Sequence, residues 1–152
     1  TVLRMSEVLD AGVVVEPRHY APFNSQNTGF LAELAPLMMV WVGVGRYDDI
    51  WASYVAERVM RDTGQMVHYG LPYVWQERNP QNRWRNLRDE LLGMEFTPQF
   101  CRDLDAMDLG TGDVLTKLAR VYEQLQGKDY LPPVVFELGR AWVGDVARAL
   151  GV

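Results

Sequence analysis

Two adjacent carboxylates, Asp48 and Asp49, come directly before a run of apolar residues at helical spacing. An aspartate at a helix start accepts hydrogen bonds from unpaired backbone N–H groups and complements the helix dipole, which stabilises by about 0.5–2 kcal/mol. One aspartate is enough for that role. The other can face a cleft, as a general base or as a ligand for sugar hydroxyls or a metal-bound water. Asp49 is better placed for the cap and Asp48 for the cleft, but a shift of one residue reverses these roles.

Two further polar groups precede this pair. Arg46 lies two residues before Asp48, where it would keep a carboxylate ionised or bind a diphosphate. A second group of neutral donors and acceptors, suited to sugar hydroxyls, lies on an expected loop and consists of Asn24, Ser25, Gln26 and Asn27. The alternative is an ordinary turn, because Asn and Ser also bond to their own backbone.

Other reactive residue types are sparse in this chain. His19 and His68 are far apart and lack neighbouring ligand residues, so structural roles are expected for both. Cys101 follows Phe100 on an expected helix, which favours packing over nucleophilic chemistry. With one cysteine, the chain can form neither an internal disulfide nor a multi-cysteine zinc site, and cytoplasm is the expected compartment.

The elements that position these residues follow from hydrophobic periodicity and from glycine and proline punctuation. The first half is expected to contain a buried strand at 12–17, a loop at 19–30, a helix interrupted at Pro36, a helix from Asp49 to Gly64, and a short strand within 66–75. Helices are expected over 87–94, 98–107, 113–126 and 134–150. One apolar stripe is predicted on the third of these, formed by Leu115, Leu118, Val121, Tyr122 and Leu125.

Length and charge limit the class of protein. The 152 residues suit one ordinary domain, and the aromatic content is enough for a real core. A net charge of −5 argues against general nucleic-acid binding, which needs clustered cations. No apolar run is long enough to suggest a membrane span. The chain begins at Thr1, which we interpret as favouring a piece of a longer protein.

Several motifs in order resemble one known family. They lie within GRYDDIWASYVAERVMRDTGQMVHYGLPYVWQERNPQNRWRNLRDE, which resembles the reversibly glycosylated polypeptides, or UDP-arabinopyranose mutases, with their G-R-[YF]-D-D-[MI]-W, G-L-P-Y-[IV]-W and N-L-x-x-E segments. The upstream LDAGVVVEPRHYAPFNSQNTGF also fits, and its PFNSQNT is closer to the STELLO-type glycosyltransferase-like proteins. The resemblance covers residues 8 to 92, and residues 95 to 152 resemble no family that we can name.

The resemblance implies a fold and a ligand. Both families are similar to GT-A glycosyltransferases, so the expected fold class is α/β: a partial GT-A-like fold, with an acceptor-side portion over 1–95 and a helical extension over 96–152. The expected ligand is a nucleotide sugar, most simply a UDP-sugar. Asp48 and Asp49 would lie at the sugar-transfer centre, with Trp51 among the substrate-binding residues.

The resemblance also points to one possible metal ligand and one possible phosphate ligand. After the second Trp of the motif region the mutases commonly carry a His, and here the residue is Gln76, a weak ligand for a transition metal. Arg78 in the same segment would bind a phosphate. A run of further arginines, whose usual explanation is a solvated face, consists of Arg83, Arg85 and Arg88.

The family's nucleotide-binding half has no counterpart here. The letters DLDAMD at 103–108 lie in a helical setting, not on a loop after a strand, and no segment matches the glycosylated arginine of the family. A divalent metal, Mn or Mg, would therefore be held mainly outside this chain, and the missing half would come from the same polypeptide or from another subunit. A homo-oligomer also remains open. The alternative function is a non-catalytic binding or assembly module derived from that fold.

Overall fold

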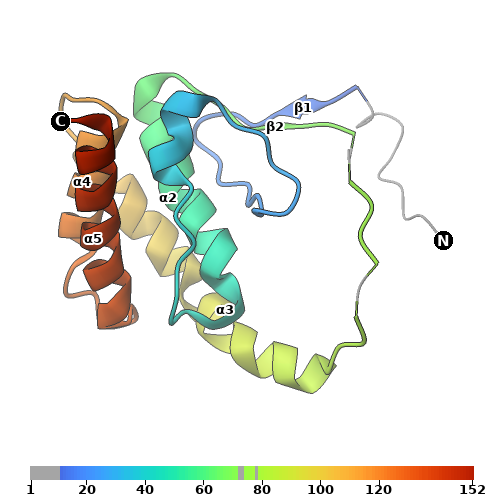
Figure 1. The fold of residues 1–152 in the computed structure, drawn as a ribbon. Helices are drawn as coiled ribbons and strands as arrows, with labels where there is room; N and C mark the ends of the chain where they lie inside the picture. Colours follow the sequence, from blue (N-terminus) through green and yellow to red (C-terminus); the bar gives the residue numbers. More distant parts are fainter. Residues whose placement is uncertain (1–10, 72–73, 78) are drawn as a thin grey trace.

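The computed structural model describes residues 11–71, 74–77 and 79–152 (Figure 1). The chain is mostly helical, with a small two-stranded sheet. Its elements in order are β1 (Val13–Val14), the 3₁₀ helices η1 (Ala32–Leu37) and η2 (Gly45–Tyr47), α2 (Asp48–Thr63), β2 (His68–Tyr69), α3 (Arg83–Asp105), α4 (Val114–Leu125) and α5 (Pro133–Leu150).

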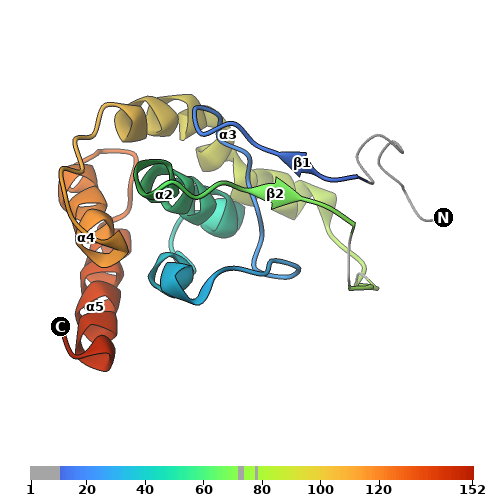
Figure 2. The ribbon, with the colours of Figure 1, turned by 90° about the horizontal axis from the view of Figure 1, so that it is seen from above.

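Helix α2 lies at the centre of the fold. Figures 1 and 2 show α4 and α5 side by side at one end of the molecule and the sheet at the other, with α2 between them. All ten residues from Trp51 to Met60 are buried, because α3, α4 and η1 cover α2 from several sides. Even Arg58 is buried, where its guanidinium donates to the carbonyls of Leu104 at 3.0 Å and Met107 at 2.7 Å. The last turn of α3 is thereby joined to α2.

The ends of α2 follow the sequence closely. The helix begins at Asp48, one residue before the predicted start, and ends before Gly64 as predicted. Gly64 has φ +80°, the left-handed conformation that glycine adopts at low cost, and its N–H donates to the carbonyl of Met60. Local chemistry alone therefore determined where this helix stops.

The prediction of two separate helices at 87–94 and 98–107 was wrong. Residues Arg83–Asp105 form one α-helix with Pro98 inside it. A proline removes one backbone hydrogen bond, to the carbonyl four residues earlier, which here belongs to the exposed Met94. Met94 lies on the exposed side of α3, and burial of the nearby Phe100 holds the helix in place.

The sheet differs from the prediction in burial. Only Val13 and Val14 of the expected strand at 12–17 are in β structure, antiparallel to Tyr69 and His68 respectively. Both valines are exposed, because no other described element covers them. The short strand predicted within 66–75 is β2, and the interrupted helix predicted over 31–41 is the 3₁₀ helix η1, which contains Pro36.

The last two helices, α4 and α5, agree with the predictions over 113–126 and 134–150. Helix α4 starts after Asp113, whose carboxylate accepts a hydrogen bond from the N–H of Thr116 at 2.8 Å. The predicted apolar stripe of α4 is fully buried. α3 crosses the boundary expected between 95 and 96, and one hydrophobic core contains residues from both sides of it. The division into two portions stays a prediction.

Candidate functional site

The turn before the acidic pair packs closely on α3. Gly45 has φ +65°, and a Cβ there would lie 2.1 Å from the carbonyl oxygen of Asp89. About one turn further along α3, a Cβ on Gly93 would lie 2.0 Å from the ring of Tyr47. Only glycine at both positions lets the backbone of η2 and the ring of Tyr47 approach α3 this closely. The two glycines therefore set the position of the acidic helix start.

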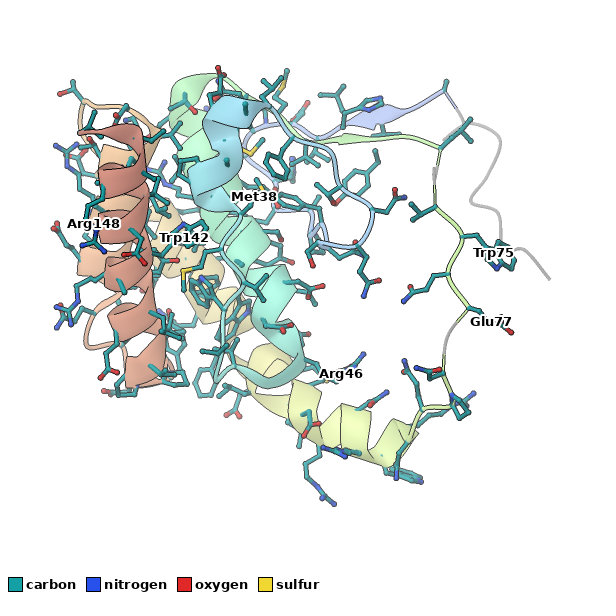
Figure 3. The ribbon with its side chains drawn as sticks, in the orientation of Figure 1. Met38, Arg46, Trp75, Glu77, Trp142 and Arg148 are labelled. Atoms are coloured by element: carbon teal, nitrogen blue, oxygen red, sulfur yellow. The ribbon has the colours of Figure 1, made fainter. Side chains whose placement is uncertain are left out.

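An ion pair joins the same two segments. The Nε of Arg46 lies 2.7 Å from Oε1 of Glu90, and both side chains are partly exposed. Glu90 is the glutamate of the N-L-x-x-E motif, so the structure brings together two motifs that lie 44 residues apart in sequence. Figure 3 shows Arg46 at the start of α2. The guanidinium of Arg46, which was expected to bind a diphosphate, thus pairs with Glu90 and links η2 to α3.

The two aspartates differ in their surroundings. Both are half-buried, and Oδ1 of Asp48 accepts a hydrogen bond from the N–H of Asp49 at 2.9 Å. The N-cap residue is Tyr47, which makes no side-chain capping bond. Asp48 therefore serves the helix start. From the sequence, Asp49 was the better placed of the two for this role, and Asp48 was assigned to the cleft. Within the described part of the chain, no hydrogen bond to the carboxylate of Asp49 is seen, and Asp49 stays a candidate for binding a ligand.

Trp51 is not available as a substrate contact in this structure, although the sequence suggested one. Its side chain has no exposed surface and stacks on Phe100 with ring centroids 4.8 Å apart. Its Nε1–H donates to Oγ1 of Thr97 at 2.8 Å, and that hydroxyl donates to the carbonyl of Gly93 at 2.6 Å. Because α3 covers this face of α2, Trp51 anchors the helix pair.

The loop predicted to hold sugar forms a local turn. Oδ1 of Asn24 accepts from the N–H groups of Gln26 at 3.0 Å and Asn27 at 3.3 Å, and the hydroxyl of Thr28 donates to the carbonyl of Asn24. The alternative of a self-bonded turn therefore accounts for Asn24. The side chains of Ser25, Gln26 and Asn27 are exposed and stay candidates for hydroxyl binding.

Three elements hold the start of this loop. The N–H of Ala21 donates to Oε2 of Glu57 on α2 at 2.9 Å. The hydroxyl of Tyr69 on β2 donates to the carbonyl of Ala21 at 2.8 Å, and that of Tyr20 donates to Asp105 on α3 at 2.9 Å. The loop is thus fixed immediately before its exposed polar tip.

Glu57 is a residue that sequence reasoning missed. It is 7% exposed, and burial raises the pKa of its carboxyl to about 7, against the opposing effects of the Ala21 N–H and Arg61. A cavity of about 10 Å³ beside Glu57, Arg61 and His19 has room for about one water molecule. Oε1 of Glu57 and two guanidinium nitrogens of Arg61 have no partner among the described protein atoms. A glutamate inside the apolar run YVAERV was the available signal.

The remaining predicted residues lie elsewhere. Gln76 is exposed between Trp75 and Glu77, which Figure 3 places on an extended segment away from Arg46. Arg78 lies outside the described residues. No three His, Cys, Asp or Glu side chains of the described chain gather where a metal ion could bind. These residues alone therefore do not fit a divalent-metal site.

Two other features lie apart from the acidic pair. Burial raises the pKa of Cys101 to about 11, which opposes nucleophilic chemistry at neutral pH and agrees with packing. A larger open hollow of about 730 Å³ lies between α3 and the α4–α5 connection, and its lining includes Phe96, Asp103 and Tyr130. None of the residues that the sequence singled out for sugar binding lines it.

The fold and site define a helical domain in which an acidic helix start is fixed to a neighbouring helix by two glycines and an Arg–Glu pair. The profile of one family, described as reversibly glycosylated polypeptide, matches residues 3–126. The chain belongs to this family. The match extends beyond the resemblance seen from sequence, which ended at residue 92, and it includes all of α3 and α4.

Plant proteins are among the curated relatives. The chain is 32% identical over 99 residues to "Probable UDP-arabinopyranose mutase 4" of Arabidopsis thaliana, covering 61% of this chain and 27% of that protein. It is 30% identical over 97 residues to "Probable UDP-arabinopyranose mutase 1" of Pisum sativum, covering 60% and 26% respectively. The chain thus spans about a quarter of the length of these relatives. No solved structure matches it, and no described helix is long and apolar enough to cross a membrane.

Proposed function

We propose that this chain forms the acceptor-side portion of a nucleotide-sugar mutase or nucleotide-sugar-dependent glycosyltransferase with a GT-A-like fold. Membership in the family and relatives named UDP-arabinopyranose mutases support a UDP-sugar as the ligand. The observation that carries the proposal is the Arg46–Glu90 ion pair, which joins two motif segments at the acidic helix start.

The proposed roles follow from the surroundings of each residue. The carboxylate of Asp49 would orient or deprotonate the reacting hydroxyl, while Asp48 holds the helix start through its bond to the Asp49 N–H. Arg46, fixed by Glu90, would lie toward the diphosphate, as would Arg78. The exposed side chains of the 25–27 segment would bind sugar hydroxyls. Any Mn or Mg would be held mainly outside this chain, because Gln76 is a weak ligand for a transition metal.

The proposal is tested by isothermal titration with UDP-sugars, with and without Mn²⁺, on this chain and on any longer native polypeptide that contains it. We expect Asp49→Asn to weaken binding by about tenfold or more, because a charge-assisted hydrogen bond is lost. Asp48→Asn should mainly lower stability, by about 0.5–1 kcal/mol. Glu123→Gln, exposed on α4, is the matched control and should bind as the wild type.

The outcomes separate the possibilities. Binding by the longer form alone would support a site divided between this chain and the rest of the polypeptide. Wild-type affinity in the Asp49→Asn variant would overturn the role of that carboxylate. No UDP-sugar binding by either form would favour the alternative, a non-catalytic assembly module, which the exposed apolar residues of α3 also favour.

A further inference from the structure

Glu57 and Arg61 both bury polar atoms that have no hydrogen-bond partner among the described residues. These atoms are Oε1 of Glu57 and Nε and Nη2 of Arg61. By contrast, Nη1 of the buried Arg58 lies 2.8 Å from Oδ1 of Asp62. Glu57 and Arg61 are four residues apart, so their side chains leave the same side of α2. Because a buried polar atom without a partner costs free energy, these atoms point to a ligand.

The remaining polar atoms of both side chains are engaged elsewhere. Oε2 of Glu57 accepts from the N–H of Ala21 at 2.9 Å. Nη1 of Arg61 lies 2.7 Å from Oδ1 of Asp105, and the guanidinium lies over the ring of Tyr20, 4.9 Å from its centroid. In the part of the chain that the structure describes, no ion pair joins Glu57 directly to Arg61. One acceptor and two donors are therefore left unpaired.

Both residues line the same small cavity. Its volume is about 10 Å³, and its other lining residues include Val15, Met60 and Val67. A cavity of this size holds about one water molecule, which in a protein interior typically makes about three hydrogen bonds. One acceptor and two donors match that number. Water also suits the charges, since an anion would be repelled by the ionised carboxyl of Glu57 and a cation by the guanidinium of Arg61.

We propose that one buried water molecule occupies this cavity and bridges Oε1 of Glu57 to the guanidinium of Arg61. The bridge closes a ring of contacts at the start of the polar loop. Ala21 is bonded to Glu57, and its neighbour Tyr20 is bonded to Asp105, the partner of Arg61. The water thereby joins the two bonds that hold the start of this loop.

The bridge also bears on the proposed function. The exposed side chains at 25–27 follow the anchored residues within a few positions. Under the proposed function these side chains bind sugar hydroxyls, and the bridge positions them by fixing the start of their loop. This consequence rests on the proposed function, whereas the water itself does not.

A crystal structure of this chain, at a resolution that shows ordered water, tests the bridge directly. We expect one water within about 3.2 Å of Oε1 of Glu57 and of Nε or Nη2 of Arg61. Glu57→Gln, the matched control, keeps a polar group and should keep the water. Glu57→Met replaces that group by an apolar chain of similar length and should lose it. An empty cavity, a direct Glu57–Arg61 contact or a water that persists in Glu57→Met would overturn the proposal.

Hydrogen exchange of the Ala21 amide tests whether the bridge holds the loop in solution. Arg61→Met keeps the apolar stem and removes the guanidinium, and exchange should become about tenfold faster or more. Asp105→Asn weakens the pair with Arg61 but leaves the bridge, so exchange should change by less than about threefold. Arg102→Met, exposed on α3, is the control and should leave it unchanged. Wild-type exchange in Arg61→Met, or an equal acceleration in Asp105→Asn, would overturn the role of the bridge.

The consequence for sugar binding has its own test. In the longer native polypeptide, Arg61→Met should raise the dissociation constant for UDP-arabinopyranose by about threefold or more, since the loop is loosened. An unchanged constant would overturn the positioning role. A wild-type polypeptide that does not bind UDP-arabinopyranose would count against the proposed function, while the crystal structure and the exchange rates still decide on the water.

Discussion

The buried carboxyl of Glu57 makes the stability of this fold depend on pH in a specific direction. Its pKa rises from 4.5 to about 7 because burial removes water from the charged form. The folded state therefore holds a proton over a pH range in which the unfolded chain has lost it. The free energy of unfolding consequently falls as the pH rises from about 4.5 through about 7. At 1.36 kcal/mol per pKa unit, the loss amounts to about 3 kcal/mol.

The substitution Glu57→Gln isolates this effect. A glutamine has nearly the same shape, and its amide oxygen can still accept the hydrogen bond from the Ala21 N–H. At about pH 5 the variant and the wild type should differ by less than about 1 kcal/mol, since Glu57 is protonated in the folded state. At about pH 8 the variant should be more stable, by up to about 3 kcal/mol.

The assay is urea unfolding followed by tryptophan fluorescence at both pH values. Glu137→Gln, an exposed glutamate on α5, is the control and should keep the pH dependence of the wild type. If Glu57→Gln gained no stability over the wild type at the higher pH, burial would not be the factor that controls this carboxyl.

The contacts of α3 with η2 and with α2 give two further predictions. Gly93→Ala should destabilise by about 1–3 kcal/mol in urea unfolding, because its Cβ would lie 2.0 Å from the Tyr47 ring. Gly144→Ala on α5, where a Cβ meets nothing within 4 Å, should instead stabilise by up to about 1 kcal/mol, and equal effects would contradict the packing argument. Thr97→Val should cost about 1–3 kcal/mol by leaving the buried Trp51 N–H without its acceptor, and a neutral result in the same assay would mean that this bond contributes nothing.

Local chemistry made several features readable from the sequence. The stop of α2 at Gly64, the start of α4 at Asp113 and the buried stripe of α4 each depend on residues within a few positions of one another. A left-handed glycine, a capping carboxylate and a 3.6-residue repeat act locally, so no knowledge of the fold was needed. The order of the motifs along the chain likewise indicated the family, which the match over residues 3–126 confirms.

Long-range packing decided the features that the sequence did not reveal. Separate helices were expected over 87–94 and 98–107, but burial of Phe100 against Trp51 holds one continuous α3. The same contact removed Trp51 from the candidate site, since an aromatic residue at helical spacing has the same sequence signature whether it lines a cleft or fills a core. Glu57 was missed because its elevated pKa depends on which elements bury it.

The sequence by itself was enough to predict where α2 and α4 end and to which family the chain belongs. It also showed which residue types could bind a sugar. The tertiary structure decided which of them meet: Arg46 pairs with Glu90, and Trp51 is buried against α3. The physical reason is separation along the chain. Arg46 and Glu90 are 44 residues apart, and only the close packing allowed by Gly45 and Gly93 brings their side chains within bonding distance.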